Sequence, residues 1–191
     1  MNISAHDVAT RTILGDLNWG RAGNLRQAIA QMYDLPGGAV RLRKMRSLAI
    51  SRAPDSRTTA LLFVGWFAAL LGWKNATPSP QAASSSQPST FNSQLSFTSA
   101  DGTPVPVELS ESSGAPIHRV ILEHDDVSIT VDHPAHSACL NLTLVWKDGR
   151  LTRHLVPADS TDLADILDDE LSRGSRHGIY LRALAAAEPL M

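Results

Sequence analysis

The side chains whose types and spacing come nearest to a reactive site are His133, His136 and Cys139. Two imidazoles and a thiolate can bind zinc, but this spacing does not match a zinc finger, and Pro134 lies inside the cluster. A junction between two strands that carries a small buried cysteine explains the same residues, and we favour it. A small zinc-dependent enzyme that uses these three residues is kept as an alternative.

Motifs for other catalytic chemistry are absent from the sequence. Gly37 and Gly38 are not followed by the Lys-Ser/Thr pair of a phosphate-binding loop, and neither a GxGxxG nor a GxSxG motif occurs. Nothing in the sequence places Cys139 in an electropositive pocket that would make it a nucleophile. We therefore expect no catalytic residues, no cofactor and no enzymatic activity.

Protein recognition is a second kind of chemistry, and it is suggested by the tetrapeptide DLNW at Asp16–Trp19, followed by Arg21 and Arg26. Tryptophan and arginine are frequent at the energetic centres of protein interfaces. Asp and Asn are also ordinary turn residues, and a tryptophan just before a helix can anchor a core. The motif therefore fits either a partner-binding corner or a structural turn.

The longest apolar run is Ala60–Trp73, fourteen uncharged residues preceded by six basic residues between positions 41 and 57. A basic flank before an apolar run is typical of a membrane anchor, but a spanning helix needs about 20 apolar residues. Leu62, Trp66, Ala69/Leu70 and Trp73 recur at steps of three and four, so they share one helical face. We expect a buried helix covered on both sides, with a single-pass membrane anchor as the alternative.

Charge is distributed unevenly along the chain, although the net charge is only −2. Residues 1–76 carry ten Lys/Arg and four Asp/Glu, about +6, whereas residues 77–191 carry seven and fifteen, about −8. This asymmetry fits two halves that attract each other, a basic surface that binds an acidic partner, or charged faces that are only solvated. The single cysteine, Cys139, excludes an intrachain disulfide and suits a reducing compartment, so we expect a cytoplasmic protein.

Helix and strand signals divide the chain into three parts. Residues 1–74 are expected to form a helix at 20–33 with Asn24 capping its start, a basic strand at 40–51, and the Trp-rich helix capped by Asp55 or Ser56. Residues 75–90, rich in Ser, Pro and Gln, are expected to be a flexible linker with nothing to pack.

Residues 91–191 are expected to complete the same domain. Strands are predicted at 91–99, 103–110, 117–123, 127–132, 139–147 and 151–155, and Pro104 and Pro106 favour a sheet edge for the second of them. Two helices follow: one is capped by Asp159-Ser160 with Leu163, Ile166, Leu167 and Leu171 inward, and one begins after Gly174-Ser175. This order indicates an α+β fold, with a mostly antiparallel sheet packed by the Trp-rich helix and the two C-terminal helices.

Several of these segments together resemble a known family. DLNW at Asp16–Trp19, RQAIAQMYD at 26–34 and GWFAALLGW at 65–73 are similar to the C-terminal domain of the OpcA family of glucose-6-phosphate dehydrogenase assembly proteins, and the tail at 159–187 resembles that family's terminal helices. The chain departs from the pattern at Leu25, where the family has tryptophan, and we expect it to lack the N-terminal α/β domain of larger members.

The resemblance implies a non-enzymatic protein that binds glucose-6-phosphate dehydrogenase and promotes its active assembly. The partner-binding residues that we predict are Asn18, Trp19, Arg26, Arg41, Arg43 and Arg46. Arginines on the basic strand could pair with carboxylates of the dehydrogenase and steer its association. The same arginines could instead neutralise the acidic helix at 162–170 within the molecule.

Overall fold

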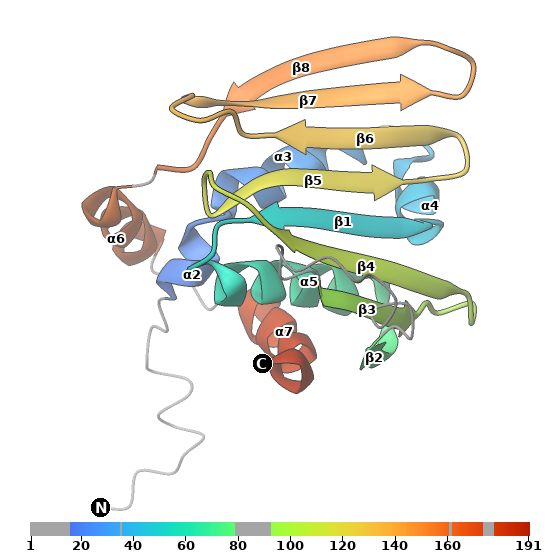
Figure 1. The fold of residues 1–191 in the computed structure, drawn as a ribbon, viewed down its shortest axis with the longest axis horizontal. Coiled ribbons are helices and arrows are strands. Elements are labelled where there is room, and N and C mark those ends of the chain that lie inside the picture. The colour runs from blue at the N-terminus through green and yellow to red at the C-terminus, as the bar shows by residue number, and fades with distance from the viewer. Residues whose placement is uncertain (1–15, 35, 79–92, 161, 174–177) are drawn as a thin grey trace, which may run out of the picture.

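One open β-sheet with helices against it forms the body of this protein (Figure 1). The computed structural model describes residues 16–34, 36–78, 93–160, 162–173 and 178–191. Its helices are α2 (Leu17–Gly20), α3 (Gly23–Met32), α4 (Gly38–Arg43), α5 (Arg57–Leu71), α6 (Leu163–Arg173), α7 (Gly178–Ala187) and the short 3-10 helix η2 (Glu188–Leu190). Its strands are β1 (Ser47–Arg52), β2 (Lys74–Pro78), β3 (Ser93–Thr98), β4 (Pro104–Glu111), β5 (Ile117–Glu123), β6 (Val127–Asp132), β7 (Cys139–Trp146) and β8 (Leu151–Pro157).

The eight strands are ordered β2-β3-β4-β1-β5-β6-β7-β8. Every neighbouring pair is antiparallel except β1 with β4, which run parallel from Leu48 opposite Val107 to Arg52 opposite Glu111. Strand β1 therefore divides the predicted meander, because it lies between two strands that both follow it in the sequence. The α+β class and the mostly antiparallel sheet are as predicted.

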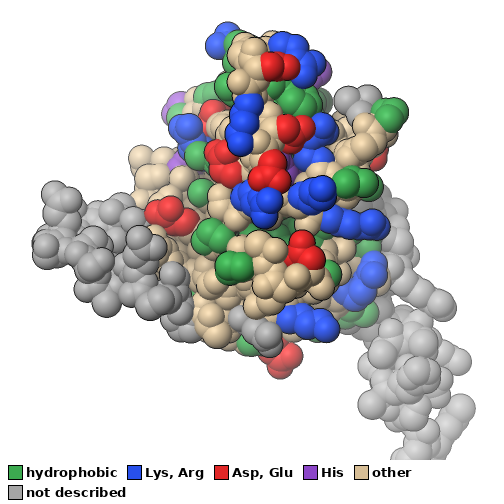
Figure 2. All heavy atoms as spheres, turned by 90° about the vertical axis from the view of Figure 1, so that its right-hand side faces the viewer, with side chains coloured by type: hydrophobic (Ala, Val, Ile, Leu, Met, Phe, Trp, Pro, Cys, Tyr) green, Lys and Arg blue, Asp and Glu red, His purple; other side chains and the backbone are tan. Residues whose placement is uncertain are grey.

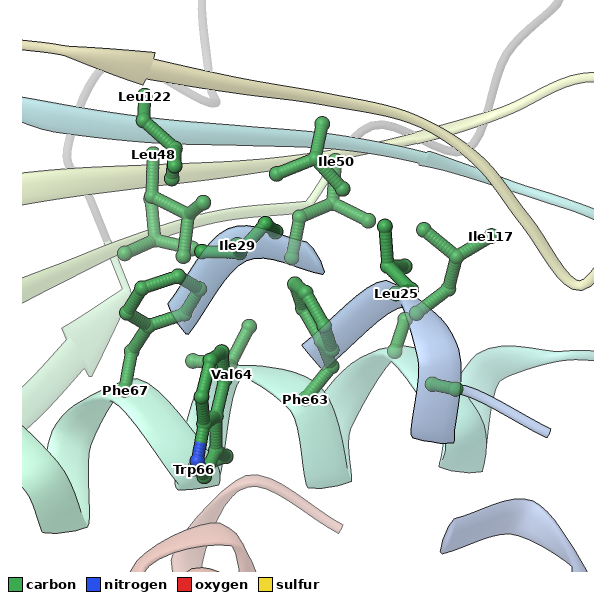
Figure 3. Packing of buried hydrophobic residues seen from close by; sticks show 14 of the residues in the cluster. Leu25, Ile29, Leu48, Ile50, Phe63, Val64, Trp66, Phe67, Ile117 and Leu122 are labelled. Carbon is green, nitrogen blue, oxygen red and sulfur yellow. The ribbon is translucent and has the colours of Figure 1, made fainter. Parts of the chain in front are cut away.

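Helix α5 lies against one face of the sheet, and its residues 59–68 are all buried. Figure 3 shows Phe63 and Phe67 pointing toward Leu48 and Ile50 of β1, with Ile29 of α3 beside them. Leu70, expected on the buried face, is 55% exposed. Of the helices in the described ranges, none is both long enough and apolar enough to cross a membrane.

The opposite side of α5 is covered by α7, which makes its principal contacts there (Figure 1). The two backbones approach closely at Gly65, where an added Cβ would lie 2.2 Å from the Ala183 carbonyl oxygen and 2.9 Å from the Ala187 Cβ. Helix α6 instead contacts α2. Leu163 and Leu167, expected to point inward, are exposed, and Ile166 is the α6 residue that is buried; the side chain of Leu171 lies outside the described residues.

Helix caps differ from those that the sequence suggested. The N-terminus of α3 is capped from a distant loop, because the Asp159 carboxylate accepts from the backbone N–H groups of Asn24 at 2.7 Å and Leu25 at 3.1 Å. Asn24 lies inside the helix, and its side-chain amide donates to the Ala158 carbonyl. Ser56 stands at the N-cap of α5 but makes no side-chain cap bond, since its hydroxyl donates to Asp55.

The predicted strand at 40–51 is wrong over its first half, where α4 forms. Gly37 adopts a φ of +80°, and Gly38 packs so closely that a Cβ would lie 2.2 Å from the Tyr33 carbonyl oxygen. The two glycines thus turn the chain sharply into a helix. Val40, whose apolar side chain suggested alternation, is 54% exposed. The alternation that does face the core begins with Leu48 and Ile50.

Two further expectations fail at the other end of the sheet. Residues 75–78, assigned to the linker, belong to β2, while 79–90 lie outside the described residues. Strand β4 is internal and not an edge. Proline has no N–H to donate to a neighbouring strand. Pro104 and Pro106 are tolerated because they have a neighbouring strand, β3, on one side only, since pairing with β1 begins only at Val107.

Replacing Trp66 tests the burial of α5. The Trp66 ring is 7% exposed, with the Phe67 ring centroid 4.7 Å away. Trp66→Ala should lower the free energy of unfolding by about 3–5 kcal/mol and the melting temperature by about 6–20 °C. Leu70→Ala, on the exposed part of the same helix, should change stability by less than about 1 kcal/mol. A Trp66→Ala protein that melts within a degree of wild type would contradict this packing.

Replacing Gly65 tests the contact between α5 and α7. Alanine should raise helix propensity by about 1 kcal/mol, but the added methyl group collides with the backbone of α7. We expect the collision to dominate, so that Gly65→Ala lowers the denaturant midpoint. The control is Gly178→Ala, because an added Cβ at Gly178 meets nothing within 4 Å. A Gly65→Ala protein as stable as wild type would show that the helices can move apart freely.

Candidate protein-binding surface

The DLNW motif forms a corner in which Trp19 is buried and Asp16, Leu17 and Asn18 are half-buried. Asp16 accepts from the backbone N–H of Asn18 at 2.8 Å and from the Tyr180 hydroxyl of α7 at 2.9 Å. Trp19 is 6% exposed, and its ring lies 5.5 Å from that of Tyr180. The Asn18 side-chain oxygen accepts from the Thr59 hydroxyl of α5. The motif thus joins the start of the described chain to α5 and α7.

Arg26, also predicted to bind a partner, completes this corner. Its guanidinium lies over the Trp19 ring at 3.4 Å from the ring centroid and donates to the Trp19 carbonyl at 2.7 Å. The side chain is 9% exposed. Cation–π stacking and a hydrogen bond compensate for burying this charge. Asn18, Trp19 and Arg26 therefore have structural contacts, and no large part of Trp19 or Arg26 faces solvent.

The three other predicted residues do lie together on the surface, around α4. We define the α4 surface as Arg41, Arg43, Lys44, Arg46, Asp125 and Asp126. It occupies the right-hand end of the sheet in Figure 1, and Figure 2 shows Lys and Arg side chains gathered on this face with Asp and Glu among them. The turn between β5 and β6 supplies the two aspartates, while α4 and the residues after it supply the basic side chains.

Ion pairs hold part of this surface in place. Arg46 makes two hydrogen bonds of 2.7 Å to Asp125, and Arg41 forms an ion pair of 3.1 Å with Asp126 while its guanidinium lies over the Trp146 ring. These hydrogen bonds lower the pKa values of both aspartates below the ordinary range and raise the pKa of Arg46. Arg41 and Arg46 are therefore paired with the β5–β6 turn, and not with the described side chains of the acidic helix at 162–170.

Arg43 and Lys44 remain available to another molecule. Both side chains are exposed, and within the described ranges neither has a carboxylate at ion-pairing distance. Because each aspartate of the α4 surface is already paired with an arginine, the charge that this surface offers is positive. Lys44 is not among the predicted partner-binding residues, although its position between Arg43 and Arg46 in the sequence was a signal for it.

A buried polar pair lies beneath the α4 surface. The Tyr33 hydroxyl, at the end of α3, is 2.8 Å from Nε2 of His124 in the β5–β6 turn. Burial lowers the pKa of His124 and raises that of Tyr33, so both side chains stay neutral at pH 7. This pair fixes the turn that carries Asp125 and Asp126 against α3. No sequence signal indicated this pair, because its two residues lie 91 positions apart in the chain.

The His133, His136 and Cys139 cluster does not come together as a metal site. His133 Nε2 bonds the Ser137 carbonyl at 2.9 Å, and His136 adopts a left-handed backbone with a φ of 60°. Over the part of the chain that the structure describes, no three His, Cys, Asp or Glu side chains converge as metal ligands. The turn between β6 and β7 follows the strand–turn–strand interpretation instead, although Cys139 is half-buried and not buried.

Solved structures similar to this chain include a ketoreductase and a dehydrogenase. A mutant of KijD10, a 3-ketoreductase from Actinomadura kijaniata, gives a TM-score of 0.58 at 13% identity, covering 96% of this chain and 60% of its own. UDP-N-acetylglucosamine 3-dehydrogenase GnnA from Acidithiobacillus ferrooxidans gives 0.55 at 17% identity, covering 96% and 62%. At such identities the likeness establishes the fold alone. The chain spans about three fifths of each enzyme.

Sequence comparison identifies the family. A putative OxPP cycle protein OpcA from Nostoc punctiforme is 36% identical over 61 residues, which is 32% of this chain and 13% of that protein. The family model that describes the C-terminal domain of the glucose-6-phosphate dehydrogenase subunit, OpcA, matches residues 12–184. Since this match covers nearly the whole chain, the protein belongs to the OpcA family through its C-terminal domain.

Proposed function

We propose that this chain is a non-enzymatic, cytoplasmic factor that binds glucose-6-phosphate dehydrogenase and promotes its active assembly. The observation that carries the proposal is the family match over residues 12–184. An assembly role within the oxidative pentose phosphate pathway also agrees with the name of the Nostoc relative.

The α4 surface is our candidate for the contact with the dehydrogenase. Arg43 and Lys44 are exposed side chains whose charges are not neutralised by the described part of the chain. Positive side chains of this kind accelerate the encounter with an acidic surface more than they strengthen the final complex. The rigid turn at Asp125 and Asp126 holds the surface in one shape, so that binding orders few additional groups.

Reconstitution tests the proposed function directly. The chain is mixed with the dehydrogenase of the same organism, and complex formation, oligomeric state and glucose-6-phosphate oxidation are measured. We expect a complex whose specific activity exceeds that of the dehydrogenase alone, with no oxidation by the chain alone. Lack of binding at micromolar concentrations, or oxidation by the chain alone, would contradict the proposal. Recovery in carbonate-washed membranes would favour the anchor alternative.

Charge reversal at Arg43 and Lys44 tests the α4 surface. Arg43→Glu with Lys44→Glu should slow association with the dehydrogenase about three- to tenfold at low ionic strength and flatten its salt dependence. Stopped-flow or biolayer measurements at several salt concentrations report both effects. Arg182→Glu is the control, because Arg182 is equally exposed but lies on α7. Equal association rates for both proteins would remove the α4 surface from the interface.

Replacing Trp19 separates a structural role from a binding role. Trp19→Ala should lower the free energy of unfolding by about 3–5 kcal/mol, because it leaves a cavity between Arg26 and Tyr180. Dissociation of the folded fraction from the dehydrogenase should stay unchanged. Tyr180→Phe, which keeps the ring and removes the bond to Asp16, should cost only about 1 kcal/mol. Faster dissociation at an unchanged melting temperature would show that Trp19 binds the partner.

A further inference from the structure

The two edges of the sheet are protected to different degrees. The β2 edge carries Lys74 and Pro78, and its register with β3 shifts between Lys74 and Thr77. Charges, prolines and irregularities of this kind prevent another strand from pairing with an edge. Strand β8 pairs with β7 from Leu151 to Pro157 without a shift, and nearly all of its residues are exposed. No other strand of the described residues pairs with its outer edge, which we call the free edge, and this edge is protected only by the charge of Arg153 and by Pro157 at its end.

The register shows which backbone groups of β8 are free. Ala158 donates to the Ala138 carbonyl, and Trp146 donates to that of Arg150, so the even-numbered residues of β8 form the hydrogen-bonded pairs with β7. In an antiparallel ladder these pairs alternate with pairs that do not bond across the strands. The N–H and C=O groups of Leu151, Arg153 and Leu155 therefore point away from β7, toward the free edge. Pro157 has no N–H and ends this row.

The outward side chains of the same three residues form an apolar surface around one positive charge. Leu155 is 71% and Leu151 53% exposed, and Val145 of β7, opposite Leu151, is 48% exposed. Arg153 lies opposite Thr143 and has no carboxylate at ion-pairing distance in the part of the chain described. A strand added here would bury these apolar side chains. The addition would be favourable if the strand also placed a negative charge against Arg153.

The other face of β8 borders an apolar cavity of about 360 Å³. Thr152, His154 and Val156 form one wall, aliphatic side chains of β6 and β7 form the floor, and Ala28, Gln31 and Met32 of α3 form the opposite wall. On an added strand, the side chains opposite Thr152 and His154 lie on the same face of the sheet as these two residues. They would therefore point to the side of the sheet on which this cavity lies.

We propose that the free edge of β8 binds an extended segment of a partner protein by strand addition. The segment has an acidic residue between two apolar residues on the outward face, and apolar residues facing the cavity. Backbone hydrogen bonds to Leu151, Arg153 and Leu155 supply much of the affinity, and the side chains supply the selectivity. A second copy of this chain fits less well, because full antiparallel overlap of two β8 strands would place each Arg153 against Leu155 of the other copy, and β8 carries no carboxylate to pair with it.

A designed peptide tests the proposal on the intact chain. The peptide contains Val-Leu-Glu-Leu-Val between flanking serines, so that glutamate faces Arg153 and the leucines face the cavity. Fluorescence anisotropy should show saturable binding. A peptide with N-methyl groups on the glutamate and the two valines keeps every side chain but cannot donate to β8. Equal binding of both peptides would overturn strand addition, as would no binding of either.

A charge swap provides a readout that misfolding cannot imitate. Arg153→Glu should weaken binding of the glutamate peptide about tenfold, and a peptide with lysine in place of glutamate should then bind this variant better than wild type. Leu155→Pro should abolish binding of both peptides while leaving the β7 ladder intact, because the Leu155 N–H faces the free edge. Equal affinities of wild type and Arg153→Glu for the two peptides would overturn the assignment of an acidic segment.

Two measurements on the free protein exclude other occupants. Amide hydrogen exchange should be fast at Leu151, Arg153 and Leu155 and slow at the even-numbered residues, with the fast amides becoming protected on addition of the peptide. Protection in the free monomer would mean that another part of this chain covers the edge. A dimer in solution that Leu155→Pro dissociates would mean that a second copy does. Either result would overturn the proposal.

Discussion

A single constraint organises the molecule: helix α5 is apolar on all sides and must be covered on all sides. The sheet covers one side through Leu48 and Ile50, and α7 covers the other. The second contact requires a residue without a side chain, and Gly65 meets this requirement at the crossing with Ala183. The last turn of α5, beyond this crossing, becomes exposed again at Leu70.

Much of the remaining architecture secures these two layers around α5. The corner at Asp16 and Trp19 binds Tyr180 and so holds α7 in place, while Asn18 reaches Thr59 of α5 itself. The carboxylate of Asp159 fixes the start of α3, whose Ile29 packs beside α5 against the sheet. Asp16 and Trp19, whose residue types suggested a binding site, thus connect the start of the described chain to α7. Their polar atoms are satisfied inside the molecule, as burial requires.

The parts of the fold that the sequence predicted well are those with local signals. The strands predicted at 117–123 and 127–132 are β5 and β6 with the same bounds, and the helix predicted at 20–33 contains α3. Long-range partners carried no such signal. The insertion of β1 between β4 and β5, and the capping of α3 by Asp159, each join residues far apart in the chain. For the candidate surface, sequence identified the arginines but could not show that Trp19 and Arg26 turn inward.

The topology also dictates when the chain can fold during synthesis. Strand β1 obtains its second neighbour only when β5 has emerged, and α5 obtains its outer cover only with α7, more than 100 positions further along the chain. The apolar run that dominates the sequence therefore stays partly uncovered until the ribosome has made the residues of α7. Nascent chains of this protein therefore expose an apolar segment of the kind that chaperones recognise. They expose it for longer than the nascent chain of a protein whose core forms near its N-terminus. The close crossing at Gly65 is then one of the last contacts to form.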